Sequence, residues 1–186
     1  AAMTLVVFLL VAAVLALAVL VVQRGVSGPS APALPPGDAP YTRAITCLVQ
    51  GDQEGALRWL KETVRQDSDN VEAYIWLGDL LRARGDAERA LAIHRELSVR
   101  HIADPALVER VYEGLTRDYL VLGRHAHAIL AAEKLRSLNR QSRAALELLL
   151  RVHEALRDWD RAYETMEELA KVDGRSPAHL ALYKSW

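Results

Sequence analysis

The feature that most constrains this sequence is a seven-residue segment that recurs four times. Its copies begin at positions 51, 85, 123 and 157, so the spacing is 34 residues, then 38, then 34 again. A fixed period of this length is produced by a chain that stacks one supersecondary unit several times. The four copies are Gly51–Leu57 (GDQEGAL), Gly85–Leu91 (GDAERAL), Gly123–Ile129 (GRHAHAI) and Arg157–Tyr163 (RDWDRAY).

The period of 34 residues is that of tetratricopeptide repeats, in which each unit is a pair of antiparallel helices. The close approach of the two helices needs small residues at fixed positions, which Gly78 supplies in a first helix and Ala56, Ala90, Ala128 and Ala162 supply in the second helices. Large apolar residues at helical spacing predict the core. They are Tyr74, Leu77, Leu81, Leu91, Leu97, Tyr112, Leu115, Tyr119, Leu135, Leu146, Leu149, Leu150 and Leu169.

The turns inside the repeats carry their own signals. Gly51, Gly85 and Gly123 tolerate the positive φ that ends a first helix, whereas Arg157 lacks that freedom, so we expect the fourth turn to differ slightly. The four extra residues between the second and third copies fall around His101–Pro105. The aspartate and proline there predict a loop or helix start that absorbs the insertion.

The first 23 residues differ from the repeats because they contain no charged side chain. Leu5–Val22 is an unbroken apolar run long enough to cross the bilayer, so we predict a retained transmembrane anchor. A cleaved signal peptide and a mis-started or cut chain are the alternatives. Arg24 and Arg43 follow the run and nothing basic precedes it, which by the positive-inside rule places the repeats in the cytoplasm.

These segments predict an all-α fold, a tetratricopeptide-repeat solenoid preceded by one transmembrane helix. The expected parts are the membrane helix at 1–23, a linker at 24–40 that holds five of the seven prolines, four repeats at 41–176, and the start of a truncated fifth repeat at 177–186. A solenoid normally ends in a polar capping element. We therefore infer that the chain is a fragment or that another surface covers its end.

Composition and motifs argue against catalysis and against nucleic-acid binding. A formal net charge of -1 lacks the basic footprint of a nucleic-acid binder. Cys47, the one cysteine, has the apolar context of a packed core residue. His125 and His127 are expected to be solvated, and His94 and His153 to be partly buried. We predict no catalytic residue, no metal ligand and no cofactor in this chain.

Protein binding is the function that remains, and the repeat register indicates which residues would contact a partner. In this repeat type, fixed positions of each first helix line the concave surface. Trp76 is the aromatic residue at these positions and the expected anchor for a partner. Ordinary solvated charges in i, i+4 pairs, such as Glu113 with Arg117 and Glu147 with Arg151, are the alternative interpretation. The predicted groove residues are Glu72, Trp76, Asp79, Arg82, Arg110, Glu113, Arg117, Glu147, Arg151 and Glu154.

The repeats also resemble a known family. Val71–Asp86 (VEAYIWLGDLLRARGD), the pairs Arg89-Ala90 and Ile93-His94, and Leu115–Tyr119 (LTRDY) with Gly123 are similar to the lipopolysaccharide assembly protein B family. The resemblance covers roughly residues 50–181. It implies a single-pass protein of the bacterial inner membrane whose repeats face the cytoplasm. It also implies a non-enzymatic adaptor that restrains lipopolysaccharide synthesis.

By the same resemblance, the expected partners are a membrane-bound AAA protease, the deacetylase of lipid A synthesis that is presented to it, and an inner-membrane signalling protein. The chain departs from the family in one respect. Family members carry a metal in a C-terminal rubredoxin-type domain with paired CxxC motifs, and this sequence has Cys47 alone. The metal site is therefore not expected here.

Three functions are open at this point. The first is the cytoplasm-facing adaptor for regulated proteolysis of an envelope-lipid enzyme. The second is a periplasm-facing repeat protein that assists secretion or envelope protein folding. The third is a hydrolase or metal-dependent enzyme in which the repeats are accessory. Membrane topology separates the first two, and a metal assay addresses the third.

Overall fold

The computed structural model describes residues 39–174, and all regular elements in that range are helices. The predicted membrane helix, almost all of the predicted linker and the predicted start of a fifth repeat lie outside the described residues. The helices are α2 (Pro40–Val49), α3 (Gln53–Gln66), α4 (Val71–Ala83), α5 (Ala87–Ser98), α6 (Pro105–Val121), α7 (His125–Leu138), α8 (Arg143–Leu156) and α9 (Trp159–Val172).

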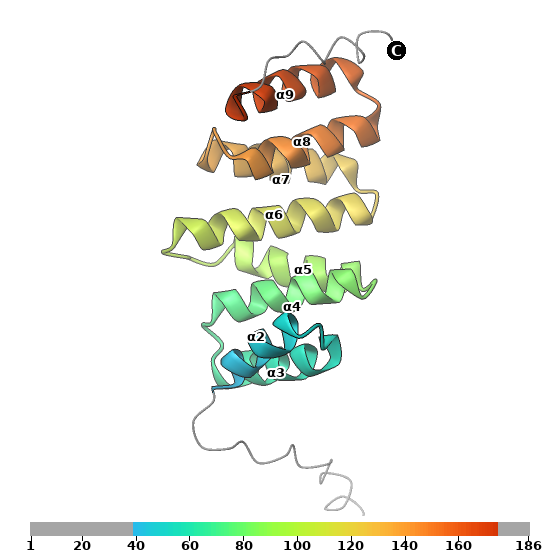
Figure 1. Ribbon diagram of the computed structural model, residues 1–186. Coiled ribbons are helices and arrows are strands. Elements are labelled where there is room, and N and C mark those ends of the chain that lie inside the picture. Colours follow the sequence, from blue (N-terminus) through green and yellow to red (C-terminus); the bar gives the residue numbers. More distant parts are fainter. Residues whose placement is uncertain (1–38, 175–186) are drawn as a thin grey trace, which may run out of the picture. The chain divides into compact units, whose positions relative to one another are not determined.

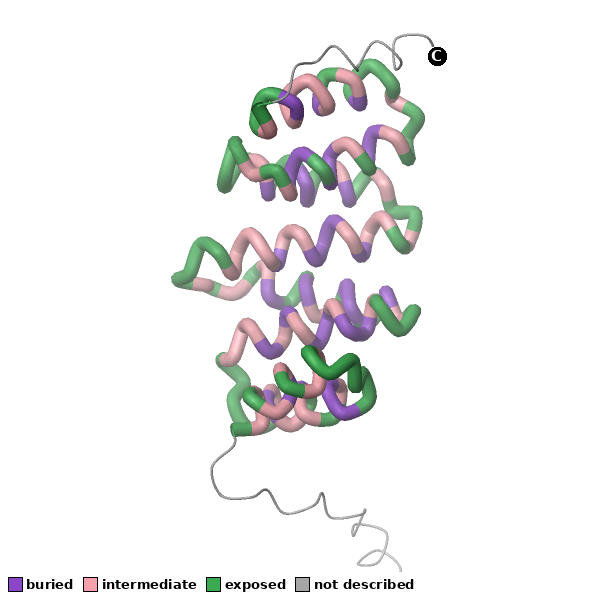
Figure 2. The backbone as a smooth tube through the Cα atoms, in the orientation of Figure 1, coloured by how far each residue is buried: buried purple, intermediate pink, exposed green. Residues whose placement is uncertain are grey.

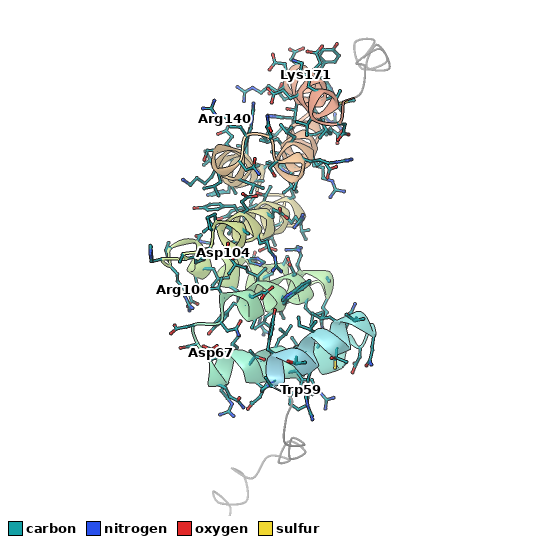
Figure 3. The ribbon with its side chains drawn as sticks, turned by 60° about the vertical axis from the view of Figure 1, so that its left-hand side comes forward. Trp59, Asp67, Arg100, Asp104, Arg140 and Lys171 are labelled. Atoms are coloured by element: carbon teal, nitrogen blue, oxygen red, sulfur yellow. The ribbon has the colours of Figure 1, made fainter. Side chains whose placement is uncertain are left out.

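Successive helices pair as hairpins and the hairpins stack, as Figure 1 shows. The tight turns within the pairs α4/α5, α6/α7 and α8/α9 lie along one edge of the stack, and the loops between repeats lie along the other. Asp67, Arg100, Asp104 and Arg140 mark these inter-repeat loops in Figure 3. The all-helical repeat fold predicted from the 34-residue period is confirmed.

The turns follow one geometry in all four repeats. Gly51, Gly85 and Gly123 have φ of 75°, 86° and 67°, as predicted. Arg157 adopts φ 56° at the equivalent position, and the Asp158 N–H donates to the His153 carbonyl at 2.9 Å as the Asp86 N–H does to the Leu81 carbonyl. The expectation of a different fourth turn is wrong, because the helix pair fixes the turn and the arginine accepts the left-handed conformation.

Side-chain caps begin most of the helices. Asp52, Asp86 and Asp158 each accept a hydrogen bond from the backbone N–H three residues later, at 2.9, 3.3 and 3.2 Å, and so start the second helix of their repeats. Arg124 takes this place in the third repeat and makes no such bond. The predicted helix start after the insertion is confirmed, since Asp104 caps α6 and Pro105 is its first residue.

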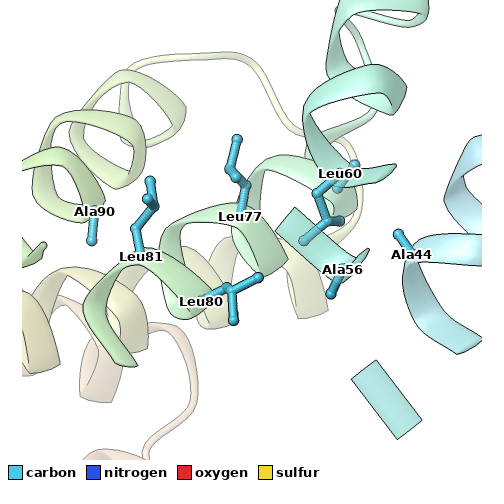
Figure 4. Packing of buried hydrophobic residues seen from close by; sticks show 8 residues of the cluster. Ala44, Ala56, Leu60, Leu77, Leu80, Leu81 and Ala90 are labelled. Atoms are coloured by element: carbon cyan, nitrogen blue, oxygen red, sulfur yellow. The ribbon is translucent and has the colours of Figure 1, made fainter. Parts of the chain in front are cut away.

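The core runs between the paired helices (Figure 2). Ala56, Ala90, Ala128 and Ala162 are all fully buried, as the need for close helix approach predicted. Figure 4 shows Ala56 and Leu60 of α3 facing the same interior as Leu77 and Leu80 of α4. The predicted leucines 77, 81, 91, 97, 115, 135, 146 and 149 are buried. Tyr74, Tyr112, Tyr119, Leu150, Leu169 and also Cys47 are only half-buried, because they lie at the margins of the helix contacts.

Among residues 39–174, no helix has both the length and the apolar character required to span a bilayer. The segment for which we predicted a membrane anchor is not among them.

Candidate partner-binding groove

The ten predicted groove residues all lie on the first helices α4, α6 and α8, where the repeat register put them. They do not form one uniform surface. The structure divides nearly all of them among three clusters: one at α2, α4 and α6, a buried one between α4, α5 and α6, and an open one between α6 and α8.

The first cluster centres on Trp76. The Arg110 guanidinium carbon lies 4.9 Å from the centroid of the Trp76 ring, and Arg110 Nη1 is 3.2 Å from Glu72 Oε1. Tyr41 of α2 completes the cluster. Burial, together with a hydrogen bond and the charge of Glu72, raises the pKa of Tyr41 to about 12, against the opposing effects of Trp76 and Arg110. Trp76 also packs on the core, so this aromatic side chain links three helices.

The second cluster is a buried ionic network. Asp118 of α6 is fully buried, and its carboxylate binds Arg82 Nη1 at 2.9 Å and His94 Nδ1 at 2.6 Å. Arg82 also binds Asp79, one turn earlier on α4. Although burial opposes the charged guanidinium, the hydrogen bonds and charges of Asp118 and Asp79 raise the pKa of Arg82. Two predicted groove residues are thus tied into the junction between the second and third repeats.

Two glycines make room for the His94 ring. A Cβ on Gly78 of α4 would lie 2.6 Å from His94 Cε1 and Nε2, and one on Gly114 of α6 would lie 2.7 Å from the same atoms. The prediction that position 78 requires a small residue is confirmed. The reason is that a larger side chain there would collide with the His94 imidazole. His94 is fully buried rather than partly buried as we expected, since helices α4 and α6 close over it.

The pairing of His94 with Asp118 has the form of a proton-transfer dyad, but its position gives it another role. Both side chains have no exposed surface, so a substrate cannot reach them in this conformation. A buried carboxylate that binds donors from two other helices instead holds those helices in one relative position.

The third cluster is an open depression of about 470 Å³ between α6 and α8. Arg117, Glu147, Arg151 and Glu154 line it together with Ala144, Leu148 and Leu150. Arg117 binds Glu113 at 3.0 Å, so Glu113 borders this cluster, and Glu147 is held by Arg143 rather than by Arg151. A lining that mixes apolar and charged side chains is suited to a protein segment.

Sequence reasoning missed three of the residues that build these clusters: Tyr41, Gly114 and Asp118. A signal was present for Asp118, because Leu115, Asp118 and Leu122 share one helical face on which a lone carboxylate needs a buried cation. Gly114 was detectable only as a glycine inside a helix. Tyr41 precedes the first recognised repeat segment, so the repeat pattern did not assign it a position within a repeat.

The chain resembles proteins of known name and known structure, although no protein-family model matches it. Lipopolysaccharide assembly protein B of Escherichia coli K12 is 28% identical over 134 residues, which are 71% of this chain and 34% of that protein. The protein of the same name from Haemophilus influenzae is 32% identical over 147 residues, 71% of this chain and 35% of the relative. The chain therefore spans about a third of the length of these relatives.

Solved structures agree on the fold. A Pseudomonas aeruginosa pilF structure has a TM-score of 0.66 at 21% identity, covering 77% of this chain and 64% of that one. A tetratricopeptide repeat protein of Thermus thermophilus has a TM-score of 0.63 at 16% identity, covering 73% of each chain. A crystal structure of MamA has a TM-score of 0.63 at 21% identity, covering 73% of this chain and 72% of that one. The resemblance first indicated by the second and third repeats is thus confirmed, and the chain is a homologue of lipopolysaccharide assembly protein B over its repeat region.

Proposed function

We propose that this chain is a non-enzymatic adaptor that binds a protein segment in the depression between α6 and α8. The observation that carries the proposal is the lining of that depression, which combines the apolar side chains of Leu148 and Leu150 with the charges of Arg117, Arg151, Glu147 and Glu154. Arg151 is exposed and has no ion pair among the described residues, so its guanidinium is available to a partner carboxylate.

The biological setting is proposed from the homologues. Their name connects them with lipopolysaccharide assembly. We place the chain at the bacterial inner membrane with its repeats on the cytoplasmic side, where it presents a lipid A synthesis enzyme to a membrane protease and restrains lipopolysaccharide synthesis. The resemblance described above and the apolar run before residue 23 support this placement.

Charge reversal in the depression tests the binding role. The double variant Arg117→Glu/Arg151→Glu is expected to lose cross-linking of the full chain to the lipid A deacetylase and to the membrane protease. Its melting temperature is expected to change little, because Arg151 is exposed and Arg117 binds only a neighbour on its own helix. The matched control is Arg58→Glu/Arg95→Glu, which reverses two exposed charges on α3 and α5. Equal loss in the control, or full retention in the test variant, contradicts the proposal.

The membrane topology of the chain tests the proposed cellular location. A cysteine placed at Ser27, in a Cys47→Ser background, is expected to react with a membrane-impermeant label only after the inner membrane is opened. Labelling once the outer membrane alone is permeable would move the repeats to the periplasm and favour a role in secretion or envelope protein folding.

A further inference from the structure

A second polar cleft lies on the other side of α8 from the partner-binding depression. Leu149 and His153 of α8 line it, and each comes two residues after a residue of that depression, Glu147 or Arg151. Positions two apart on a helix lie about 200° apart around its axis. The walls come from the neighbouring helices: Glu133 and Arg136 of α7 on one side, and Arg161, Glu164 and Glu168 of α9 on the other.

The cleft holds a buried hydrogen-bonding atom that no described residue satisfies. His153 is 6% exposed, and its Nδ1 is buried without a hydrogen-bond partner. Burial is the main cause that lowers the pKa of His153, which favours the neutral imidazole. A buried polar atom left unpaired has a free-energy cost. A ligand that donates a hydrogen bond here would remove this cost.

The charges around His153 favour a cationic ligand. Arg136 binds Glu168 at 2.6 Å, and Arg161 lies 3.5 Å from Asp158. Glu133 and Glu164 make no ion pair among the residues that the structure describes, and both favour positive charge at the imidazole. The carboxylates of Glu133 on α7 and Glu164 on α9 therefore line the cleft on the two sides of the His153 imidazole without an ion-pair partner among the described residues.

The size and spacing of the cleft indicate what kind of cation fits. Its volume is about 220 Å³, several times the roughly 30 Å³ that one water molecule occupies in the liquid. Within residues 39–174, no three His, Cys, Asp or Glu side chains are close enough to hold a metal ion. The acceptors that the cleft offers are the carboxylates of Glu133 and Glu164 and the Nδ1 atom of His153. A planar group with several diverging N–H donors, such as guanidinium, can reach them together.

We propose that this cleft binds the guanidinium of an arginine side chain on a protein partner, with Glu133 and Glu164 accepting its charge-assisted hydrogen bonds and His153 Nδ1 accepting a further N–H. The site goes beyond the proposed function, because it does not involve the depression between α6 and α8. It gives the fourth repeat a second point of attachment, and loss of either site leaves the other intact.

The test observes the His153 ring directly. The full chain, with isotope-labelled histidine and in detergent micelles at about pH 7.5, is titrated with N-acetyl-arginine amide while the imidazole resonances are recorded by NMR. The His153→Gln variant assigns the signal. We expect a saturable shift of the His153 resonances, and no saturable shift with the neutral isostere N-acetyl-citrulline amide or with sodium chloride at the same ionic strength.

Variants separate the carboxylates from general charge. Glu133→Gln/Glu164→Gln is expected to weaken arginine-amide binding at least about tenfold, since both ionised acceptors are lost. Glu54→Gln/Glu96→Gln, at two exposed positions on α3 and α5 outside both binding sites, removes the same charge and should leave binding unchanged. An equal shift with citrulline amide, equal affinity for N-acetyl-lysine amide, equal weakening by both double variants, or the absence of any shift would each overturn the proposal.

Discussion

Two buried histidines of this protein have opposite surroundings. His94, between the second and third repeats, has its Nδ1 2.6 Å from the Asp118 carboxylate and its ring between Gly78 and Gly114. His153, on α8, has its Nδ1 buried without a partner and faces an open cleft with unmatched carboxylates. His94 Nε2 is also buried without a hydrogen-bond partner among the described residues, but the His94 ring is fully enclosed, whereas the cleft beside His153 is open to a ligand.

The difference shows how a repeat protein can combine a fixed framework with a binding surface. Each repeat contacts only the repeats next to it. One junction between repeats can therefore be fixed by a buried ionic network while another keeps an open binding site. Buried ionic networks specify a single packing, whereas an unpaired buried atom that lines an open cleft can be reached by a ligand. Four changes test this contrast, from the largest expected effect to the smallest.

Removing the Asp118 charge should have the largest effect. Asp118→Asn leaves Arg82 without a buried anionic partner and weakens the bond to His94, so we expect the free energy of unfolding to fall by about 3–5 kcal/mol. Urea denaturation followed by circular dichroism measures it. Asp79→Asn, which touches Arg82 from the more exposed side, is the matched control with an expected loss of less than about 1 kcal/mol. Similar losses in both variants would mean that Asp118 is not the centre of the network.

Filling the space beside His94 should cost less. In Gly114→Ala the new methyl group would lie 2.7 Å from the imidazole, so we expect a loss of about 1–3 kcal/mol. The same substitution in a His94→Ala background should cost clearly less, because the obstructing ring is gone. A double-mutant cycle from denaturation midpoints gives the coupling, and equal cost in the two backgrounds would refute the contact.

The fourth turn should gain stability from a glycine. Arg157 has φ 56°, a conformation that costs an L-residue about 1–2 kcal/mol, so Arg157→Gly is expected to stabilise the chain by about 0.5–1 kcal/mol after the entropy of the glycine is counted. Gly85→Arg, at the equivalent turn with φ 86°, should destabilise. The melting temperatures of the two variants should therefore shift in opposite directions. A shift of both in one direction would contradict the shared turn geometry.

The smallest expected effect is the pH dependence contributed by His153. Burial and Arg161 lower its pKa below the ordinary value of about 6.5, against the opposing charges of Asp158, Glu133 and Glu164. The associated stabilisation is fully present above the unfolded pKa and is lost as pH falls through the folded pKa. Stability should therefore fall more steeply below about pH 6.5 in the wild type than in His153→Phe. Parallel curves for the two proteins would show that His153 does not contribute.

The repeat pattern predicted the fold but only part of the site. The 34-residue period, the turn glycines and the buried alanines depend on helix geometry and local sterics, which recur in every copy. The predicted groove residues lie on the first helices α4, α6 and α8, as expected, because register is also a local property. Which of them lie in open solvent was not predictable, since Arg82 binds Asp118, a residue 36 positions away, and Asp79 binds Arg82.

The sequence by itself determined the helix pairs, three of their four turns and the helices on which the predicted groove residues lie, because the period and the spacing of small and apolar residues act within one repeat. Only the tertiary structure decided that Asp118 binds Arg82 and His94, that Gly114 as well as Gly78 makes room for the His94 ring, and that His153 Nδ1 has no hydrogen-bond partner within residues 39–174. Those outcomes depend on how far one helix lies from the next, because a buried carboxylate is stabilised only where donors from other helices come within hydrogen-bond distance of it.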